Sequence, residues 1–558
     1  MARRESKNIQ KNNIKKIIMF LAIILVLIIA VVIFSKSRNK ENVAKTRLII
    51  NNNNVTERLK QDVLIEDNII YLSMNDIKNF FDKYIYLEEE IDKIVTTYGS
   101  KIAEIGFEEK KVIINGAKKE VFATLIEKNE VTYLPISEMS DVYNVEIKYN
   151  KEDNIITMDS LNKELVKADI LKNTSVKSQP KFLSRKLEKI KRGEGVVIIS
   201  ETEDGYAKIR TKSGIMGYVK KNKLTNIITV REDLIKEEKT EKVSLVWDYF
   251  SQYAKAPNRT SEKLEGVNVV SPSFFYINEK GTFKENIGTE GKKYIEWAHS
   301  KGYEVWPMVS NAEAGIEITS KILNSYEARR NLIEKLVAVC VEYELDGINI
   351  DFENMYQEDK DVFSRFIIEL TPRLKDIGVI VSVDVTAPDG AETWSLCYNR
   401  NVIGDVADYI IFMAYDQYGT SSKKPGTTAG YNWVETNVKK FVGVQEDIDS
   451  SKVILGIPFY TKIWTITSSG DVTSKTVNMK DIQNVLPANV EKNWDDNLKQ
   501  YYVEYISGNT TKKMWIEDLE SLKQKLSLVG KYELGGVACW EKDRETEEVW
   551  SLIKENLK

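Results

Sequence analysis

The chain has 558 residues, of which 42% are hydrophobic and 29% charged, and a formal net charge of −4. This length predicts several domains, and the absence of a broad basic charge argues against a nucleic-acid partner. The three cysteines, Cys340, Cys397 and Cys539, lack the close spacing of a zinc or redox motif. The single histidine, His299, falls in a predicted helix, so neither a Ser-His-Asp triad nor a polyhistidine metal site is easy to build. We therefore expect no metal and no cofactor.

The amino terminus predicts a membrane anchor. Residues 1–16 are strongly basic and precede the uncharged run 17–34, which would span ~27 Å as a helix. We expect a cytoplasmic tail at 1–16 and an uncleaved transmembrane anchor at 17–34. A cleaved signal peptide is the alternative, but no clear small-residue cleavage site follows the run. The positive flank predicts a single-pass protein of the cell membrane with a cytoplasmic amino terminus and extracellular domains.

Residues 45–160 contain a weak internal repeat. Ile49–Asn51 corresponds to Ile113–Asn115, and in each copy short alternating strands follow. A short helix is expected after the strands, at 74–82 in the first copy and at 137–143 in the second. The repeat predicts a small α+β domain.

Two resemblances concern this part of the chain. The second copy of the repeat, ending in Val145–Met158, resembles the copper amine oxidase N-terminal-like module. It contains no histidine, so we expect neither copper nor oxidase chemistry, and a spacer or wall-binding module is the preferred interpretation. Residues 165–228 predict short strands, and Asp204–Ile209 followed by Gly217–Val219 is similar to the bacterial SH3-like barrel. That resemblance implies binding to peptidoglycan or peptide stems; a small β-barrel that only positions its neighbour is the alternative.

After a charged linker near 231–242, apolar strands alternate with helical segments, the pattern of a parallel α/β sheet. Eight such strands predict a (β/α)8 TIM barrel over residues 240–558. The longest gap, between the seventh and eighth strands, predicts an inserted αβ subdomain that contains 476–508. The eight candidate strands are 243–247, 266–270, 304–309, 347–352, 379–385, 409–414, 453–457 and 536–540.

The fourth candidate strand carries the main functional signal. Side chains alternate between the two faces of a strand, so Asn349, Asp351 and Glu353 share one face, and three apolar residues share the other. Carboxylates grouped at the end of an apolar strand are costly to bury for packing alone. Because TIM barrels place their active sites at the carboxyl ends of the strands, Asp351 and Glu353 are candidate catalytic residues.

These residues also carry a family resemblance. Asp346–Glu353 resembles the Asp-Gly-x-Asp-x-Asp-x-Glu signature of glycoside hydrolase family 18. Phe412–Asp416 fits the Met-x-Tyr-Asp motif of the family's sixth strand, and Trp540 fits its eighth-strand tryptophan. The sequence departs from the signature at Asn349, where the family has aspartate, as expected for the subgroup that acts on bacterial cell walls and spores.

The resemblance implies a retaining, substrate-assisted cleavage in which the 2-acetamido group of the sugar attacks the anomeric carbon. Glu353 would be the general acid and later the base, Asp351 would orient the acetamido nitrogen, and Tyr415 would donate a hydrogen bond to the acetamido oxygen. Further residues are expected to bind substrate: Trp540 as an apolar floor, Met413, Asp416, Asn349 and, from weaker signals, Trp433 and Tyr418.

The predicted function is therefore a membrane-anchored glycosidase that cleaves β-linked N-acetylglucosaminyl bonds in peptidoglycan or a chitin-like glycan. One alternative is a catalytically silent, lectin-like barrel that binds wall glycan. Another is a conventional glycosidase that uses two carboxylates, with its nucleophile elsewhere in the barrel.

Overall fold

The computed structural model describes residues 45–231, 241–388 and 390–557, which form two units. One unit contains 45–72 and 144–231, and the other contains 73–143 and 241–557. The predicted tail and the predicted anchor at 17–34 lie outside the described residues. Among the residues that are described, no helix has the length and apolar character needed to cross a membrane. This finding contradicts the predicted localisation as a single-pass membrane protein.

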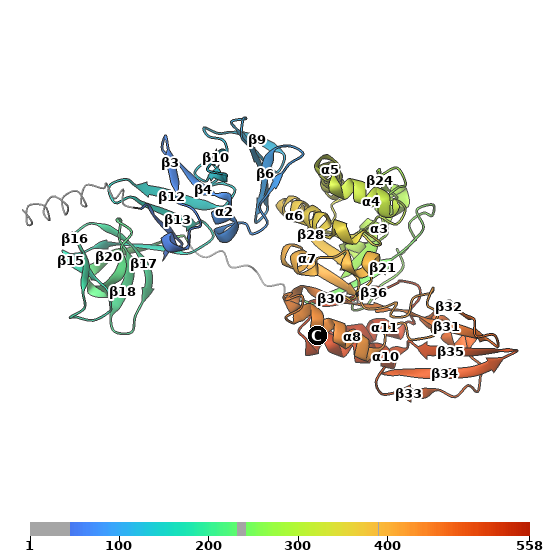
Figure 1. Cartoon of the computed structure of the whole chain (residues 1–558). Coiled ribbons are helices and arrows are strands. Elements are labelled where there is room, and N and C mark those ends of the chain that lie inside the picture. The colour runs from blue at the N-terminus through green and yellow to red at the C-terminus, as the bar shows by residue number, and fades with distance from the viewer. Residues whose placement is uncertain (1–44, 232–240, 389, 558) are drawn as a thin grey trace, which may run out of the picture. The chain divides into compact units, whose positions relative to one another are not determined.

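The first unit consists of strands (Figure 1). Four strands form one sheet in the order β12-β13-β1-β2, in which β1 runs parallel to β13. Seven antiparallel strands form a second sheet where the SH3-like module is predicted, and Ala168, Ile209 and Val219 are among its buried core residues. The strands are β1 (Arg47–Ile50), β2 (Asn53–Asn54), β3 (Leu64–Glu66), β4 (Ile69–Ser73), β12 (Val145–Asn150), β13 (Ile155–Ser160), β14 (Leu165–Ile170), β15 (Thr174–Lys177), β16 (Lys186–Ile190), β17 (Gly195–Glu201), β18 (Tyr206–Arg210), β19 (Met216–Lys220) and β20 (Leu224–Arg231).

Residues 73–143 begin the second unit. Helix α2 (Met74–Phe80) is capped by Ser73, whose hydroxyl accepts a hydrogen bond from the Asp76 amide at 3.1 Å. The helix expected at 137–143 is instead a series of turns, in which bonds such as that from the Val142 amide to the Met139 carbonyl span only three residues. The strands here are β5 (Tyr86–Glu88), β6 (Lys93–Tyr98), β7 (Lys101–Gly106), β8 (Lys111–Ile114), β9 (Ala117–Glu120), β10 (Ile126–Lys128) and β11 (Val131–Pro135).

The structure confirms the predicted TIM barrel. The third strand is split into two pieces, of which β25 pairs with β22 and β26 pairs with β27, so the ring of parallel strands closes. Closure brings all the carboxyl ends of the strands to one rim. The barrel strands are β21 (Val243–Asp248), β22 (Val269–Pro272), β25 (Glu304–Val305), β26 (Met308–Ser310), β27 (Gly347–Asp351), β28 (Ile380–Val385), β29 (Tyr409–Met413), β30 (Val453–Pro458) and β36 (Gly536–Trp540), with a hairpin of β23 (Phe275–Ile277) and β24 (Phe283–Glu285) beside them.

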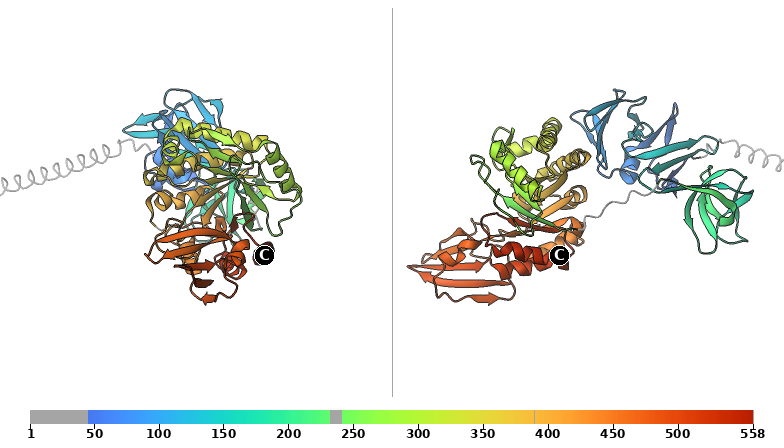
Figure 2. Two further views of the ribbon diagram at one scale, coloured as in Figure 1. Left: turned by 90° about the vertical axis from the view of Figure 1, so that its right-hand side faces the viewer. Right: turned by 180° about the vertical axis from the view of Figure 1, so that it is seen from behind.

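Helices cover the outside of the barrel (Figures 1 and 2). The apolar face of β27 points toward them, and Phe352, which directly follows the strand, stacks on Phe363 and Phe366 of α6 with ring centroids 5.9 and 5.8 Å apart. The opposite face of β27 therefore points into the barrel. The helices are α3 (Gly288–Ser300), α4 (Gly315–Asn324), α5 (Tyr326–Glu342), α6 (Lys360–Asp376), α7 (Arg400–Val406), α8 (Tyr431–Val442), α10 (Leu519–Lys531) and α11 (Glu548–Asn556).

The insertion between the seventh and eighth strands extends on both sides of residues 476–508. It begins directly after β30 and forms a five-stranded antiparallel sheet that projects beside α8 and α10 (Figures 1 and 2). Buried Val503 and Met514 give this sheet a small core of its own. Its elements are β31 (Tyr460–Thr467), β32 (Val472–Asn478), α9 (Ile482–Val485), β33 (Asn493–Asp495), β34 (Gln500–Ser507) and β35 (Thr510–Ile516).

Buried charges join strand β5 to the barrel helices. Arg329 of α5 is 1% exposed and donates hydrogen bonds to Glu369 of α6 and, at 2.9 Å, to Glu88 of β5. The Tyr86 hydroxyl donates a further bond to Glu369. Removing one partner of such a buried ion pair leaves an uncompensated charge, which is strongly destabilising. Residues 73–143 are thus fastened to the barrel.

A substitution at Gly347 would test how tightly the inside of the barrel is packed. A Cβ atom at this position would lie 2.5 Å from the ring of Trp306, whose side chain is fully buried. We expect Gly347→Ala to reduce the free energy of unfolding by about 1–3 kcal/mol, because the ring cannot shift without disturbing its neighbours. Urea denaturation would measure this change.

Gly530→Ala provides the control, since the Cβ would enter open space on helix α10. Alanine favours a helix over glycine by up to ~1 kcal/mol, so this variant should be neutral or slightly more stable. Equal stabilities for the two variants would contradict the packing argument.

Candidate active site

The candidate site lies at the carboxyl ends of the barrel strands and is supported from below by Asn349. This side chain is fully buried inside the barrel, where its Oδ1 accepts a hydrogen bond from Trp247 Nε1 at 2.8 Å. Its Nδ2 donates to Asp384 Oδ1 at 2.8 Å and to Ser382 Oγ at 3.1 Å. Because the indole N–H can only donate, it fixes which end of the amide faces Asp384. Asn349 is therefore placed beneath the site, linking β21, β27 and β28.

Asp351 ends strand β27, and Glu353 follows two residues later on the same side. The Glu353 backbone is held by Asn311, whose side-chain amide makes two 2.9 Å bonds with the Glu353 N–H and carbonyl. The next residue, Asn354, has a φ of 50°, a left-handed conformation that asparagine tolerates and that turns the chain away. The Glu353 carboxyl group thus remains at the rim of the barrel.

The environment of these carboxyl groups favours their protonated forms. Burial raises the pKa of Asp351 to about 7. Burial, with the charges of Asp351 and Asp416, raises the pKa of Glu353 well above its ordinary value. A carboxyl group that keeps its proton near neutral pH is suited to act as a general acid.

The structure adds Asp384, a residue that we did not single out from the sequence. It lies on β28, is 1% exposed, and burial together with the charge of Asp351 raises its pKa well above the ordinary value. A signal was present, because Ser382, Asp384 and Thr386 alternate with valines in an otherwise apolar strand. That alternation indicates polar side chains on the inner face of the barrel.

Aromatic rings form one wall of the site. Trp540 lies at the end of β36, with its ring centroid 5.7 Å from that of Trp247 and 6.4 Å from that of Tyr415. The ring of Tyr249, which is 54% exposed, lies 6.1 Å from that of Trp540. These contacts hold Trp540 between buried and exposed rings, with apolar surface at the rim.

The sixth strand and the insertion meet at Asp416. This residue follows Tyr415, has a φ of 54°, and accepts a hydrogen bond from the Tyr460 hydroxyl at 2.7 Å. It also pairs with Lys462, whose side chain is 2% exposed. Met413 lies two residues before Tyr415, so it is on the same inner face of the strand, and it is buried.

The two weaker candidates occupy different surroundings. Trp433 lies on helix α8 and packs against Phe412, which belongs to the core between barrel and helices. The structure therefore places Trp433 apart from the carboxyl groups, on the outer side of the barrel. Tyr418 lies in the loop after β29, where its ring covers Gly426 closely enough that a Cβ there would approach within 2.3 Å.

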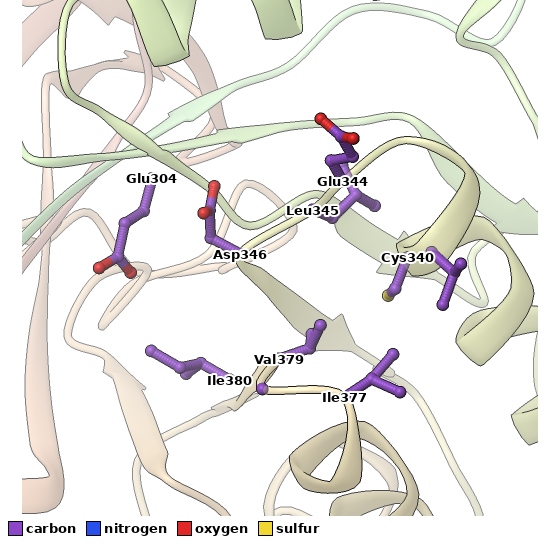
Figure 3. A pocket seen from close by; sticks show the side chains of 10 residues that line it. Glu304, Cys340, Glu344, Leu345, Asp346, Ile377, Val379 and Ile380 are labelled. Carbon is purple, nitrogen blue, oxygen red and sulfur yellow. The ribbon is translucent and has the colours of Figure 1, made fainter.

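A pocket of about 530 Å³ lies at the opposite end of the barrel (Figure 3). It is lined by residues at the amino-terminal starts of strands, including Glu304, Asp346 and Ile380. Asp346 accepts hydrogen bonds there from the Val305 amide at 2.8 Å, and its Oδ2 lies 2.9 Å from His299 Nε2. Asp346 is thus tied to strand β25 at the end away from Glu353.

Across residues 45–231, 241–388 and 390–557, no cluster of three His, Cys, Asp or Glu side chains is arranged to hold a metal ion.

Comparisons with known proteins assign the barrel region to a family. The family model described as Glycosyl hydrolases family 18 matches residues 245–545, more than half of the chain, and the Copper amine oxidase N-terminal domain matches residues 49–193. The uncharacterized glycosylase YvbX of Bacillus subtilis is 27% identical over 305 residues, 52% of this chain and 85% of the relative. The cortical fragment-lytic enzyme of Bacillus subtilis is 20% identical over 315 residues, 54% of this chain and 72% of the relative. The chitinase from Chromobacterium violaceum ATCC 12472 has a TM-score of 0.51 and 25% identity, covering 56% of this chain and 99% of that structure.

The raised pKa of Asp351 predicts how stability depends on pH. Between pH ~4, where an unfolded aspartate loses its proton, and about 7, the folded protein keeps a proton that the unfolded chain releases. The free energy of unfolding should therefore decrease as the pH rises through this window. Asp351→Asn removes this titration, so its melting temperature should fall less between pH 5 and pH 8 than that of the wild type.

Calorimetry of both proteins at several pH values would measure the difference. Asp496→Asn, at a side chain that is 85% exposed, is the control and should follow the wild type. Parallel curves for the wild type and Asp351→Asn would contradict the raised pKa.

Proposed function

Because the chain belongs to family 18 of the glycosyl hydrolases, a family of TIM-barrel glycosidases, we propose that it cleaves β-linked N-acetylglucosaminyl bonds in peptidoglycan by a substrate-assisted, retaining mechanism. The observation that carries this proposal is the Glu353 carboxyl group, which is held at the rim beside Asp351 where burial favours its protonated form. Glycoside cleavage needs such an acid, since the leaving oxygen must be protonated as the bond breaks.

In the first step, Glu353 gives its proton to the glycosidic oxygen. The carbonyl oxygen of the sugar's 2-acetamido group attacks the anomeric carbon, whose bond to the protonated glycosidic oxygen breaks. The rest of the glycan leaves as an alcohol, and a cyclic oxazolinium-type intermediate remains. In the second step, Glu353, now ionised, takes a proton from water as the water opens that ring. The general acid is thereby restored, and the configuration at the anomeric carbon is retained.

Asp351 and Tyr415 are the groups we assign to the acetamido function. Asp351 would accept a hydrogen bond from the acetamido N–H, which becomes more acidic as positive charge develops in the ring. Tyr415 would donate its hydroxyl to the acetamido oxygen and so hold it for the attack. Burial and the neighbouring charge of Asp384 raise the pKa of Tyr415 well above its ordinary value, so its hydroxyl keeps the proton that it donates.

Trp540 would form the floor beneath the sugar, since a pyranose presents C–H groups to an aromatic face. The rings of Trp247 and Tyr415 lie beside it and would support it there. Asp416 would bind a sugar hydroxyl, oriented by Tyr460 and Lys462. Tyr418, in the loop after β29, would be a further contact at the edge of the site.

The choice of peptidoglycan over chitin rests on two observations. Asn349 replaces the family aspartate, a departure expected of the subgroup that acts on bacterial cell walls and spores. One relative is named cortical fragment-lytic enzyme. The similarity to a chitinase structure keeps a chitin-like glycan as the competing substrate. The SH3-like module predicted at 165–228 would hold the chain on the wall.

Glu353→Gln tests the assigned acid. Glutamine is similar in size but cannot transfer the proton, so we expect kcat to fall ~10²–10⁴-fold while the protein stays folded. Release of reducing ends from purified peptidoglycan and from N-acetylglucosamine oligomers would measure the loss. The control is Glu358→Gln, at an exposed glutamate just beyond the site, which should keep full activity. Wall binding without turnover by the wild type would instead indicate the lectin-like alternative.

The nature of the nucleophile can be tested through the substrate. If the acetamido group attacks the anomeric carbon, oligomers of glucosamine or glucose should not be cleaved at a measurable rate, even at concentrations that saturate binding. Mass spectrometry of the products from matched oligomers would check this expectation. Cleavage of sugars without the acetamido group would favour a conventional glycosidase with two carboxylates.

A further inference from the structure

Asp384 is a buried carboxyl group to which the mechanism above assigns no role. Strands β27 and β28 are parallel, with Asn349 paired to Ser382 and Ile350 paired to Val383. Continued by one residue, this register sets Asp351 beside Asp384 on the inner face, and neighbouring strands lie only ~4.8 Å apart. The two carboxyl groups are therefore direct neighbours across the strands.

The immediate partners of Asp384 do not compensate a second negative charge. The Asn349 amide donates a hydrogen bond to it, the indole of Trp247 lies nearby, and both side chains are neutral. The titratable groups around it are Asp351 and Glu353 from β27 and the loop that follows, and Tyr415 from the segment after β29. Two carboxyl groups this close, with Asp384 buried and Asp351 only partly exposed, cannot both ionise readily, so one of them keeps a proton.

Asn349 explains why the carboxyl group is on the neighbouring strand. The family signature has an aspartate at this position, which would lie two residues before Asp351 on the same face of β27. Here an amide occupies the position, and Trp247 fixes it so that its N–H points at Asp384. The pair of Asn349 and Asp384 therefore has one amide and one carboxyl group. The carboxyl group that the family signature has on β27 is replaced here by one on β28.

We propose that Asp384 is a positioning residue that shares one proton with Asp351 across strands β27 and β28, in place of the carboxyl group absent at Asn349. This role rests on the proposed substrate-assisted mechanism. When the acetamido oxygen attacks, the shared proton stays on Asp384, and Asp351 is free as a carboxylate to accept the acetamido N–H. When the intermediate is hydrolysed, the proton returns to its shared position. No proton is gained or lost by the pair.

Exchanging the two side chains tests this inference. Asp384→Asn removes one of the two groups that share the proton, so we expect kcat to fall ~10–100-fold with little change in KM. The basic limb of the kcat profile should move to lower pH, because the variant cannot gain the second negative charge that the pair acquires at high pH and that raises the pKa of Glu353. The double variant Asn349→Asp/Asp384→Asn returns the carboxyl to β27 and keeps one amide facing one carboxyl. Its kcat should be at least tenfold higher than that of Asp384→Asn.

One control variant separates this role from simple support of the structure. Ser382→Ala removes another hydrogen-bond partner of Asn349 without touching a carboxyl group, and it should leave the pH profile in place. A kcat for Asp384→Asn within twofold of the wild type would overturn the proposal. So would a folded double variant that is no more active than Asp384→Asn, and this comparison holds even if the single variant folds poorly.

Infrared spectroscopy of the full chain supplies a test that does not need turnover. At pH 7 the wild type should show carbonyl absorption from protonated carboxyl groups, both from Glu353 and from the pair of Asp351 and Asp384. Asp384→Asn should lose the part that belongs to the pair and keep the part that belongs to Glu353. Equal band intensity in the wild type and in Asp384→Asn would overturn the shared proton, whatever the activity. If the intensity falls but the wild type cleaves no glycan, the proposed function fails while the shared proton stands.

Discussion

The site depends on one constraint: carboxyl groups must be held side by side where little water reaches them. A closed ring of parallel strands meets this constraint, because its register fixes which side chains are neighbours and its carboxyl ends meet at a single rim. The cost of burying charge is avoided when the groups keep protons. The chemistry we assign to Glu353 is therefore a consequence of where β27 ends.

Hydrogen bonds below and behind the rim keep this arrangement in place. Asn349 joins three strands through Trp247, Ser382 and Asp384, and each of these bonds is formed inside the barrel. Asn311 holds the Glu353 backbone from the neighbouring strand segment. Such supporting contacts matter because small displacements of an acid from its target reduce proton transfer sharply.

Much of the barrel could be predicted because its signals are local. Alternation along residues 347–352 separates the two faces of β27 without any knowledge of its neighbours, and runs of apolar residues mark the other strands. Asp384 was missed because its meaning depends on the register between β27 and β28, which one strand alone does not reveal. Trp433 was included for a related reason: its position along the chain does not show that helix α8 turns it toward Phe412. The start of the insertion carries no signal in the sequence, because β31 follows β30 after a single residue and no break in the pattern marks it.

The buried ion pairs of Arg329 have a consequence for how the enzyme can be divided. Glu88 lies in the amino-terminal part of the sequence, yet its charge is matched by an arginine of the barrel. A fragment that begins at the first barrel strand would lose this partner, and the adjoining surfaces of α5 and α6 would be exposed to water. A piece of this hydrolase that keeps every ion pair of Arg329 is therefore discontinuous in sequence, with residues 73–143 joined to a barrel whose first strand begins a hundred residues later.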